Sequence, residues 1–453
     1  MTGDETSVRP ARSARQRLGA LDRRVFTIAV ASFVRSSGRS ASWLFLPLIL
    51  YIGYGLSLIQ VGLLVSALVP LSVMVNLYGG AAADRYGRRS FVVWPPLGSA
   101  LTFFALYELW HQGIVVLMSL WAVIVVLTNL QQPAQNAMMG DVTQQGDRSV
   151  AFGIQRVFAN AGFALAPAVG GLLATSFGLS IVFLMAAITS AGEGIVLVSF
   201  LKETFRGTAR DGPSGEGTSE SSGQRWAARI RAPFRDRFLL TFGILGFCLT
   251  LATQQFGTPL SLFMATVQHL PYSEIGLVYS LNGVVVVGLQ IPISWGIRRR
   301  QLLWMGVGIL LYGAAFLVFD LSPGFMVNLG AIFVLTLGED ITSPTQNAVL
   351  SGLSGRSRRG SYFAAYNVFT SSAQAIAPSL GALLLGFGYH VLWLPFSLLT
   401  VAVAIGYAWL HHRDHEPPSA PPEEGRPGAA SNPVTPATTV TGAKHTGFGH
   451  SGP

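Results

Sequence analysis

The stretch YGGAAADRYGRR, Tyr78 to Arg89, places one acid and three arginines directly after about twenty residues that carry no charge. A long apolar run followed by a basic turn is typical of a helix that crosses a membrane and ends at its surface. Two glycines bracket the acid, which predicts a tight turn between two such helices. The rest of the sequence decides whether this pattern is repeated.

The whole chain is poor in charge. Half of its 453 residues are hydrophobic and 11% are charged, whereas ordinary soluble proteins carry about 25% charged residues. The runs 113–130 and 302–319 contain no charge at all, and each is long enough to cross a hydrocarbon core of roughly 30 Å. We therefore predict an all-α integral membrane protein with many spans.

Hydropathy predicts twelve transmembrane helices. They cover residues 25–50, 58–78, 90–110, 114–138, 149–174, 180–201, 238–264, 275–296, 302–320, 325–350, 361–386 and 390–410. With a cytoplasmic N-terminus, 27 of the 30 basic residues fall in cytoplasmic segments, and only Arg35, Arg39 and Arg156 lie inside spans. This distribution follows the positive-inside rule. We therefore expect a multi-pass protein of the plasma membrane with both termini in the cytoplasm. The basic excess sets topology, and we expect no nucleic-acid partner.

The spans divide into two groups. An N-terminal six-helix bundle is predicted over 24–201 and a C-terminal one over 238–413. A basic cytoplasmic tail (1–23) precedes them, and a middle loop (202–237) with a Gly/Ser-rich linker joins them. We expect the last segment, 414–453, to be a disordered cytoplasmic tail, because it is rich in Pro, Gly, Ala and Thr.

The two groups are related by an internal repeat. The segment that begins QQPAQNAMMGDV aligns without a gap with the one that begins TSPTQNAVLSGL, so that Pro133 meets Pro344 and, at the same offset, Pro167 meets Pro378. Apolar helices that are similar only by chance rarely keep prolines and polar residues in register. Repeats of this kind commonly place a transporter's substrate site between the two halves, near mid-membrane.

With the span count and the repeat in place, the opening stretch resembles the signature loop of the major facilitator superfamily. The matching residues are Gly80, Asp84, Arg85, Gly87, Arg88 and Arg89. The fifth span, GFALAPAVGG, resembles the glycine-proline motif of that superfamily's twelve-span drug:proton antiporters. Its residues are Gly162, Pro167, Gly170 and Gly171, with Pro378 and Gly381 as their repeat mates. The resemblance implies two pseudo-symmetric six-helix bundles around a central cavity.

The resemblance also implies roles for these motifs. Asp84 would hold the halves together on the cytoplasmic side, near the positive N-terminus of the eleventh helix, and Arg88 would pair with Asp141 at the end of the fourth. The glycine-proline residues would let the fifth and eleventh helices bend and pack across the boundary between the halves. The arginine that this branch carries near the start of the fourth span is absent, since 117–128 contains no charge.

Ionisable groups inside spans are costly and are therefore candidates for function. Glu339 and Asp340 in the tenth span are candidates for protonation or substrate contact, and Arg35 and Arg39 share one face of the first helix. These two arginines either contact substrate or form a structural ion pair. Arg156 and Glu193 are predicted to form a buried ion pair within the first half. The polar residues that either line the pathway or bridge helices are Gln135, Asn136, Gln254, Gln255, Gln346 and Asn347.

The residues favour secondary active transport by alternating access, with proton-coupled export of a small organic molecule or drug as the leading function. One alternative is a carrier of a small organic anion with Arg35 and Arg39 as its anion site; another is a membrane receptor or sensor without net transport. No nucleotide-binding loop, catalytic triad or metal-ligand cluster is present. We therefore expect no enzymatic activity, no cofactor or metal apart from the proton as coupling ion, and no obligate protein partner.

Overall fold

The described part of the chain is a set of long helices without strands. The structure, a computed structural model, describes residues 21–144, 147–201, 235–297, 300–321, 324–353 and 359–413. Most of the N-terminal tail and of the middle loop, and all of the C-terminal tail, lie outside these ranges. The described unit ends at Arg413, and the predicted division of that unit into two bundles at the middle loop stays a prediction.

The first half holds six long helices. They are α2 (Arg23–Leu48), which continues as the π-helix η1 (Ile49–Gly53), α3 (Leu58–Tyr86), α4 (Arg88–Leu109), α5 (Ile114–Asp141), α6 (Arg148–Phe177) and α7 (Ile181–Phe200). Reciprocal hydrogen bonds between Ser57 and Gln60 begin α3, because each side chain accepts from the other residue's backbone N–H.

The second half repeats this pattern with one difference. Its helices are α9 (Arg237–Thr253), the short η4 (Gln254–Phe256), α10 (Thr258–Thr266), α11 (Tyr272–Gly296), α12 (Gln301–Leu321), α13 (Phe325–Leu353), α14 (Arg359–Phe387) and α15 (Tyr389–Arg413). The predicted span over 238–264 matches a candidate membrane span, Arg237–Thr266, but its helix is interrupted. Gly257 separates η4 from α10, and Pro259 stands in the first turn of α10, where its missing N–H costs nothing.

Most of these helices have the length and composition of membrane spans. Among the described residues, eleven helices are long and apolar enough to cross a membrane, with α9, η4 and α10 counted together. The remaining predicted span is α2, which has 26 residues. Its four arginines, Arg23, Arg24, Arg35 and Arg39, lower its hydropathy.

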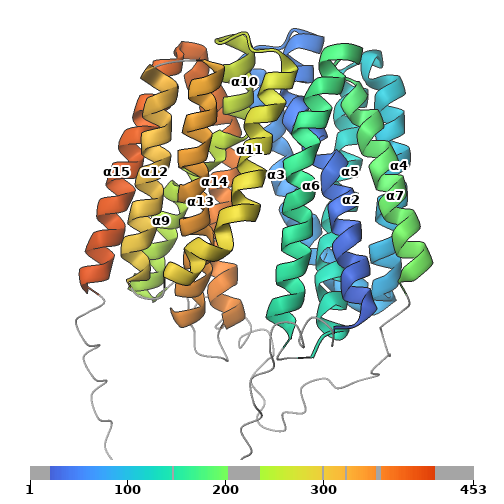
Figure 1. Cartoon of the computed structure of the whole chain (residues 1–453), viewed down its shortest axis with the longest axis horizontal. Coiled ribbons are helices and arrows are strands. Elements are labelled where there is room, and N and C mark those ends of the chain that lie inside the picture. Colours follow the sequence, from blue (N-terminus) through green and yellow to red (C-terminus); the bar gives the residue numbers. More distant parts are fainter. Residues whose placement is uncertain are drawn as a thin grey trace, which may run out of the picture. The chain divides into compact units, whose positions relative to one another are not determined.

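The helices pack in two groups, and two helix pairs form the largest contacts between them. In the first half α2 packs on α6 and α7, and α4 packs on α5 and α7; in the second half α12 packs on α13 and α15, and α9 on α14. The halves meet where α6 packs on α11 and α3 packs on α14 (Figure 1). The internal repeat relates α3 to α11 and α6 to α14, so it exchanges the two contacts.

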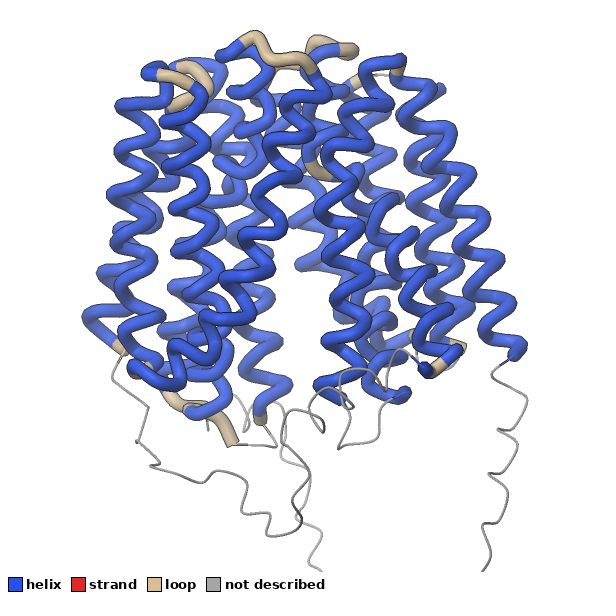
Figure 2. Tube along the Cα trace, turned by 180° about the vertical axis from the view of Figure 1, so that it is seen from behind, coloured by secondary structure: helices blue, strands red, loops and turns tan. Residues whose placement is uncertain are grey.

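The two ends of this unit differ. We call the end at which α2 begins and α15 ends the basal end, and the opposite end the distal end (Figure 1, bottom and top). Near the distal end the helices of the two halves lie against each other, and their ribbons diverge toward the basal end (Figure 2). Small residues permit the distal approach, because a Cβ added to Gly171 or Gly276 would overlap the backbone carbonyl of Tyr272 or Pro167.

Candidate functional site

Two polar chambers lie between the helices and share part of their lining. The first, which we call the arginine chamber, has a volume of about 250 Å³ and is lined from both halves. Its side chains include Trp43, Arg156, Asn160, Phe163, Asn282 and Glu339. The second, the amide chamber, has a volume of about 240 Å³ and includes Thr253, Gln254, Tyr312, Glu339, Gln346 and Asn347. Glu339 and Phe256 line both chambers.

Glu339 is held in place by one hydrogen bond from a neighbouring helix. Asn282 on α11 donates from Nδ2 to Glu339 Oε2 at 2.9 Å and to Thr336 Oγ1 at 3.0 Å. Because Asn282 is 4% exposed, its amide orients the carboxyl group firmly. The other oxygen, Oε1, has no hydrogen-bond partner among the described residues. Glu339 therefore faces the chambers with one oxygen fixed and the other available.

Asp340 occupies a different environment, although it is the next residue of α13. Its side chain is 0% exposed, and neither carboxyl oxygen has a hydrogen-bond partner in the described part of the chain. It lies one turn from Thr336 and one turn from Pro344, on the side of α13 that faces α11. The two adjacent acids are thus separated, since only Glu339 reaches the chambers.

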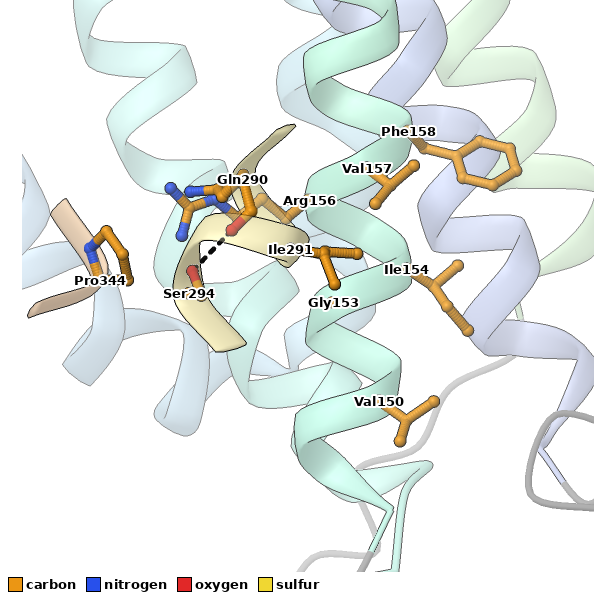
Figure 3. A pocket seen from close by; sticks show the side chains of 10 residues that line it. All are labelled: Val150, Gly153, Ile154, Arg156, Val157, Phe158, Gln290, Ile291, Ser294 and Pro344. Atoms are coloured by element: carbon orange, nitrogen blue, oxygen red, sulfur yellow. Dashed lines mark hydrogen bonds between the residues drawn. The ribbon is translucent and has the colours of Figure 1, made fainter. Parts of the chain in front are cut away.

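Arg156 lies where it was not expected. The prediction that it pairs with Glu193 was wrong, because its exposed side chain leaves α6 on the side of α11 and α13 and points toward Pro344 (Figure 3). It lines the arginine chamber and also a groove of about 520 Å³ between α6 and α11, which includes Gln290, Ser294 and Pro344. Arg156 forms no hydrogen bond or ion pair with a described residue.

Glu193 pairs instead with the first helix. Its side chain is 1% exposed, accepts from Gln131 Nε2 at 2.7 Å and lies 3.9 Å from Arg35 Nη1. Arg35 also donates to Gln135 Oε1 at 2.7 Å. Arg39 lies one turn further along α2 and has no hydrogen-bond or ion-pair partner among the described residues. Of the two arginines on this face of α2, Arg35 is therefore held by the buried acid Glu193 and by the amide of Gln135.

The opening stretch is more helical than predicted. Helix α3 continues to Tyr86, and only Gly87, with φ of 99°, separates it from α4. Arg88 Nη1 lies 2.5 Å from Asp141 Oδ2 at the end of α5, and Arg89 donates to the backbone carbonyl of Leu201 at 2.8 Å. The side chains of Gly80 and Asp84 lie outside what the structure describes, so the role of Asp84 in holding the halves together stays a prediction.

Arg85 completes the set of basic residues in this stretch. Its guanidinium lies over the Tyr86 ring, 5.4 Å from the centroid, and both side chains are exposed. Arg85, Arg88 and Arg89 therefore all lie at the basal end, where α3 meets α4.

The glycine-proline residues lie at close helix contacts. A Cβ on Gly162 would overlap the carbonyl of Phe33, one on Gly170 would overlap Ala41, and one on Gly381 would overlap Gln255 and Pro259. The N–H that follows each proline bonds across to the other half: Ala168 donates to Ser280 Oγ at 2.8 Å, and Ser379 donates to Ser66 Oγ at 3.1 Å.

Sequence reasoning missed several residues that line the chambers. Asn160 and Asn282 were not singled out, although an asparagine inside a span is a detectable signal because its amide needs a partner in the membrane. Gln254, Gln346 and Asn347 were left open between two roles and line the amide chamber. In the described part of the chain, no group of three or more His, Cys, Asp or Glu side chains could hold a metal ion.

Comparison with known proteins identifies the family. A family model described as Major Facilitator Superfamily matches residues 28–378 and 337–447. The chain belongs to this superfamily. It is therefore a multi-pass membrane transporter and not an enzyme, as the resemblance of the signature loop predicted, and its fold is the all-α fold of that superfamily.

The chain is similar to transporters of different kinds. A Na(+), Li(+), K(+)/H(+) antiporter of Planococcus maritimus is 24% identical over 366 residues, which cover 75% of this chain and 85% of the relative. Multidrug resistance protein 2 of Bacillus subtilis (strain 168) is 24% identical over 351 residues, which cover 76% and 84%. A crystal structure of peptide transporter POT in complex with sulfate has a TM-score of 0.68 at 18% identity and covers 89% of this chain and 99% of that one; this likeness concerns the fold.

Proposed function

We propose that this superfamily member is a proton-coupled exporter of small organic molecules that works by alternating access. The observation that carries the proposal is Glu339, a carboxyl group near the middle of α13 that lines both chambers. An acid exposed to a cavity inside the membrane can take up a proton from one side and release it to the other when the halves rearrange. The relatives named as multidrug resistance and cation/proton antiport proteins support this reading.

The basal end is the proposed cytoplasmic side. The described arginines outside the middle of the helices lie at this end, among them Arg85, Arg88, Arg148 and Arg413, and basic residues favour the cytoplasm. With the halves in contact at the distal end, this conformation corresponds to one that accepts a substrate from the cytoplasm. That is the starting state for an exporter.

The alternative of an anion carrier with its site at Arg35 and Arg39 receives less support. Arg35 is already held by Glu193 and Gln135, so its charge is largely compensated inside the first half. An anion arriving at this place would have to compete with a buried carboxylate. We therefore assign Arg35 a structural role.

Everted membrane vesicles with a respiration-driven pH gradient, reported by a quenched dye, test the proposal. Cationic, anionic, zwitterionic and neutral organic compounds are added in turn to vesicles that contain the wild-type protein, the Glu339→Gln variant or no transporter. We expect at least one compound to collapse the gradient in wild-type vesicles only. A full response in the Glu339→Gln vesicles would contradict the role of Glu339, and no response to any compound would contradict proton-coupled export.

A further inference from the structure

The arginine chamber brings together polar groups without partners. Arg156 and Asn160 lie four residues apart on one face of α6, and neither forms a hydrogen bond or ion pair with a described residue. Across the chamber, Glu339 Oε1 is also without a partner among those residues. Arg156 is exposed and Asn160 and Glu339 are half-buried, so all three keep hydrogen-bonding capacity for a molecule that enters the cavity they line.

The two charges of the chamber stand apart. Arg156 comes from the first half and Glu339 from the second, and no ion pair within 4.0 Å joins them. A ligand with a single charge would form a charge-assisted contact with one wall only. A ligand that carries both charges satisfies both walls at once.

We propose that the arginine chamber binds a small zwitterion with an aromatic or aliphatic body, a substrate class that rests on the export function proposed above. The carboxylate of the ligand binds the Arg156 guanidinium and the Asn160 amide. Its ammonium group binds Glu339, whose other oxygen Asn282 already orients. The ligand therefore contacts both halves of the protein.

The remaining walls and the size of the chamber fit this class. Trp43 and Phe163 also line the chamber, and aromatic side chains suit both the apolar body of the ligand and its ammonium group. The volume of about 250 Å³ lies just below the range of roughly 300–1,000 Å³ for ligand pockets. A molecule with a single ring fits a chamber of this volume.

The same contacts couple the ligand to the proton. When the ammonium group arrives, the proton of the Glu339 carboxylic acid leaves to water and a carboxylate–ammonium pair replaces it. Because one ammonium group replaces one proton at Glu339, the binding of each ligand molecule releases one proton. A ligand without the ammonium group binds Arg156 without displacing this proton.

A series of four compounds with one ring tests the assignment. The series is para-(aminomethyl)benzoate, its amide para-(aminomethyl)benzamide, the anion para-methylbenzoate and the neutral para-methylbenzamide. Each competes with radiolabelled para-(aminomethyl)benzoate for the purified wild-type protein in lipid nanodiscs. We expect the zwitterion to bind about tenfold or more tightly than either singly charged compound, because each charge-assisted contact is worth roughly 1.5–3 kcal/mol.

Variants assign each charge to its residue. Arg156→Gln should remove the preference for compounds with a carboxylate and keep the preference for the amine, and Glu339→Gln should do the reverse. Arg156→Lys should restore part of the carboxylate preference. Arg148→Gln on the same helix and Glu274→Gln at the start of α11 are matched controls outside the chamber and should bind like the wild type.

The outcomes separate this inference from the proposed function. Absence of saturable binding of para-(aminomethyl)benzoate, or equal binding of all four compounds by the wild-type protein, overturns the zwitterion site. Because that result concerns only ligand class, a compound that collapses the pH gradient of wild-type vesicles and not of Glu339→Gln vesicles would still leave proton-coupled export in place.

Discussion

At the level of single residues, a buried ion pair between Arg35 and Glu193 stabilises the packing of the first half. It joins α2 to α7, and Gln131 and Gln135 complete the hydrogen bonds of both charged groups. Removing one partner of a buried pair leaves the other charge uncompensated, which costs more than the net contribution of the pair itself.

Replacing Glu193 therefore has a predictable effect. For Glu193→Gln we expect a loss of about 3 kcal/mol in the free energy of unfolding, because the Arg35 charge stays buried alone. The double variant Arg35→Gln/Glu193→Gln should recover part of this loss. Unfolding of the purified proteins in an SDS titration measures both values. The single variant Arg35→Gln completes the cycle; if the losses of the two single variants simply add in the double variant, the residues are not coupled and the ion pair is not structural.

The partners of these residues show where sequence reasoning stops. Runs without charge revealed which ionisable groups lie inside spans, and at the offset of the repeat Glu339 aligns with Thr128, which is not acidic. Which face of its helix each group occupies depends on how the helices are rotated against one another. Arg156 and Glu193 were predicted to pair only because they lie at a similar depth in the membrane. The rotation of α6 and α7 about their own axes instead directs Arg156 toward the chambers and Glu193 toward α2.

At the scale of helices, two hydrogen bonds related by the repeat close the distal end. Ser66 on α3 and Ser280 on α11 each accept from the N–H after a proline, on α14 and α6 respectively. Gly62 and Gly276 stand one turn before these serines and let the helix pairs approach. The hydrogen bonds exist only while the halves are in contact at this end, so they stabilise the conformation with a closed distal end.

Removal of both serine hydroxyl groups should open the distal end more often. Each hydrogen bond contributes roughly 0.5–1.5 kcal/mol, so Ser66→Ala/Ser280→Ala should raise the ratio of distal-open to distal-closed protein about fivefold or more. Spin labels at Glu108 and Met326, with Cys248 replaced by Ser, report the distance between the halves. Ser72→Ala is the matched control, because its hydroxyl bonds only within α3. An unchanged distance distribution in the double variant would refute this role.

Most helix limits follow from the sequence to within a few residues, and the exceptions have physical causes. Helix α3 extends to Tyr86 instead of ending near 78, because hydropathy detects the part in the hydrocarbon and not the turns that project beyond it. The interruption at Gly257 lies inside one predicted span, shortly after Gln254 and Gln255, and a hydropathy average over a whole span does not record breaks in a helix. A glycine followed closely by a proline was the available signal.

At the scale of the whole molecule, the charges near the middle of the described helices are divided unequally between the halves. The first half carries Arg35, Arg39 and Arg156 with one acid, Glu193, whereas the second half carries Glu339 and Asp340. The halves therefore attract each other across the chambers when the acids are ionised. Under the proposed proton coupling, protonation of Glu339 would weaken this attraction and so link the proton to the relative position of the halves.

In the proposed mechanism, Glu339 exchanges its proton for the substrate. The most direct measurement records protons released when a compound active in the vesicle test is added to purified protein in weakly buffered detergent with a pH-indicator dye. We predict release from the wild-type protein, none from Glu339→Gln, and retained release from Asp340→Asn, because Asp340 does not reach the chambers. Equal proton release from wild-type and Glu339→Gln protein would contradict the account.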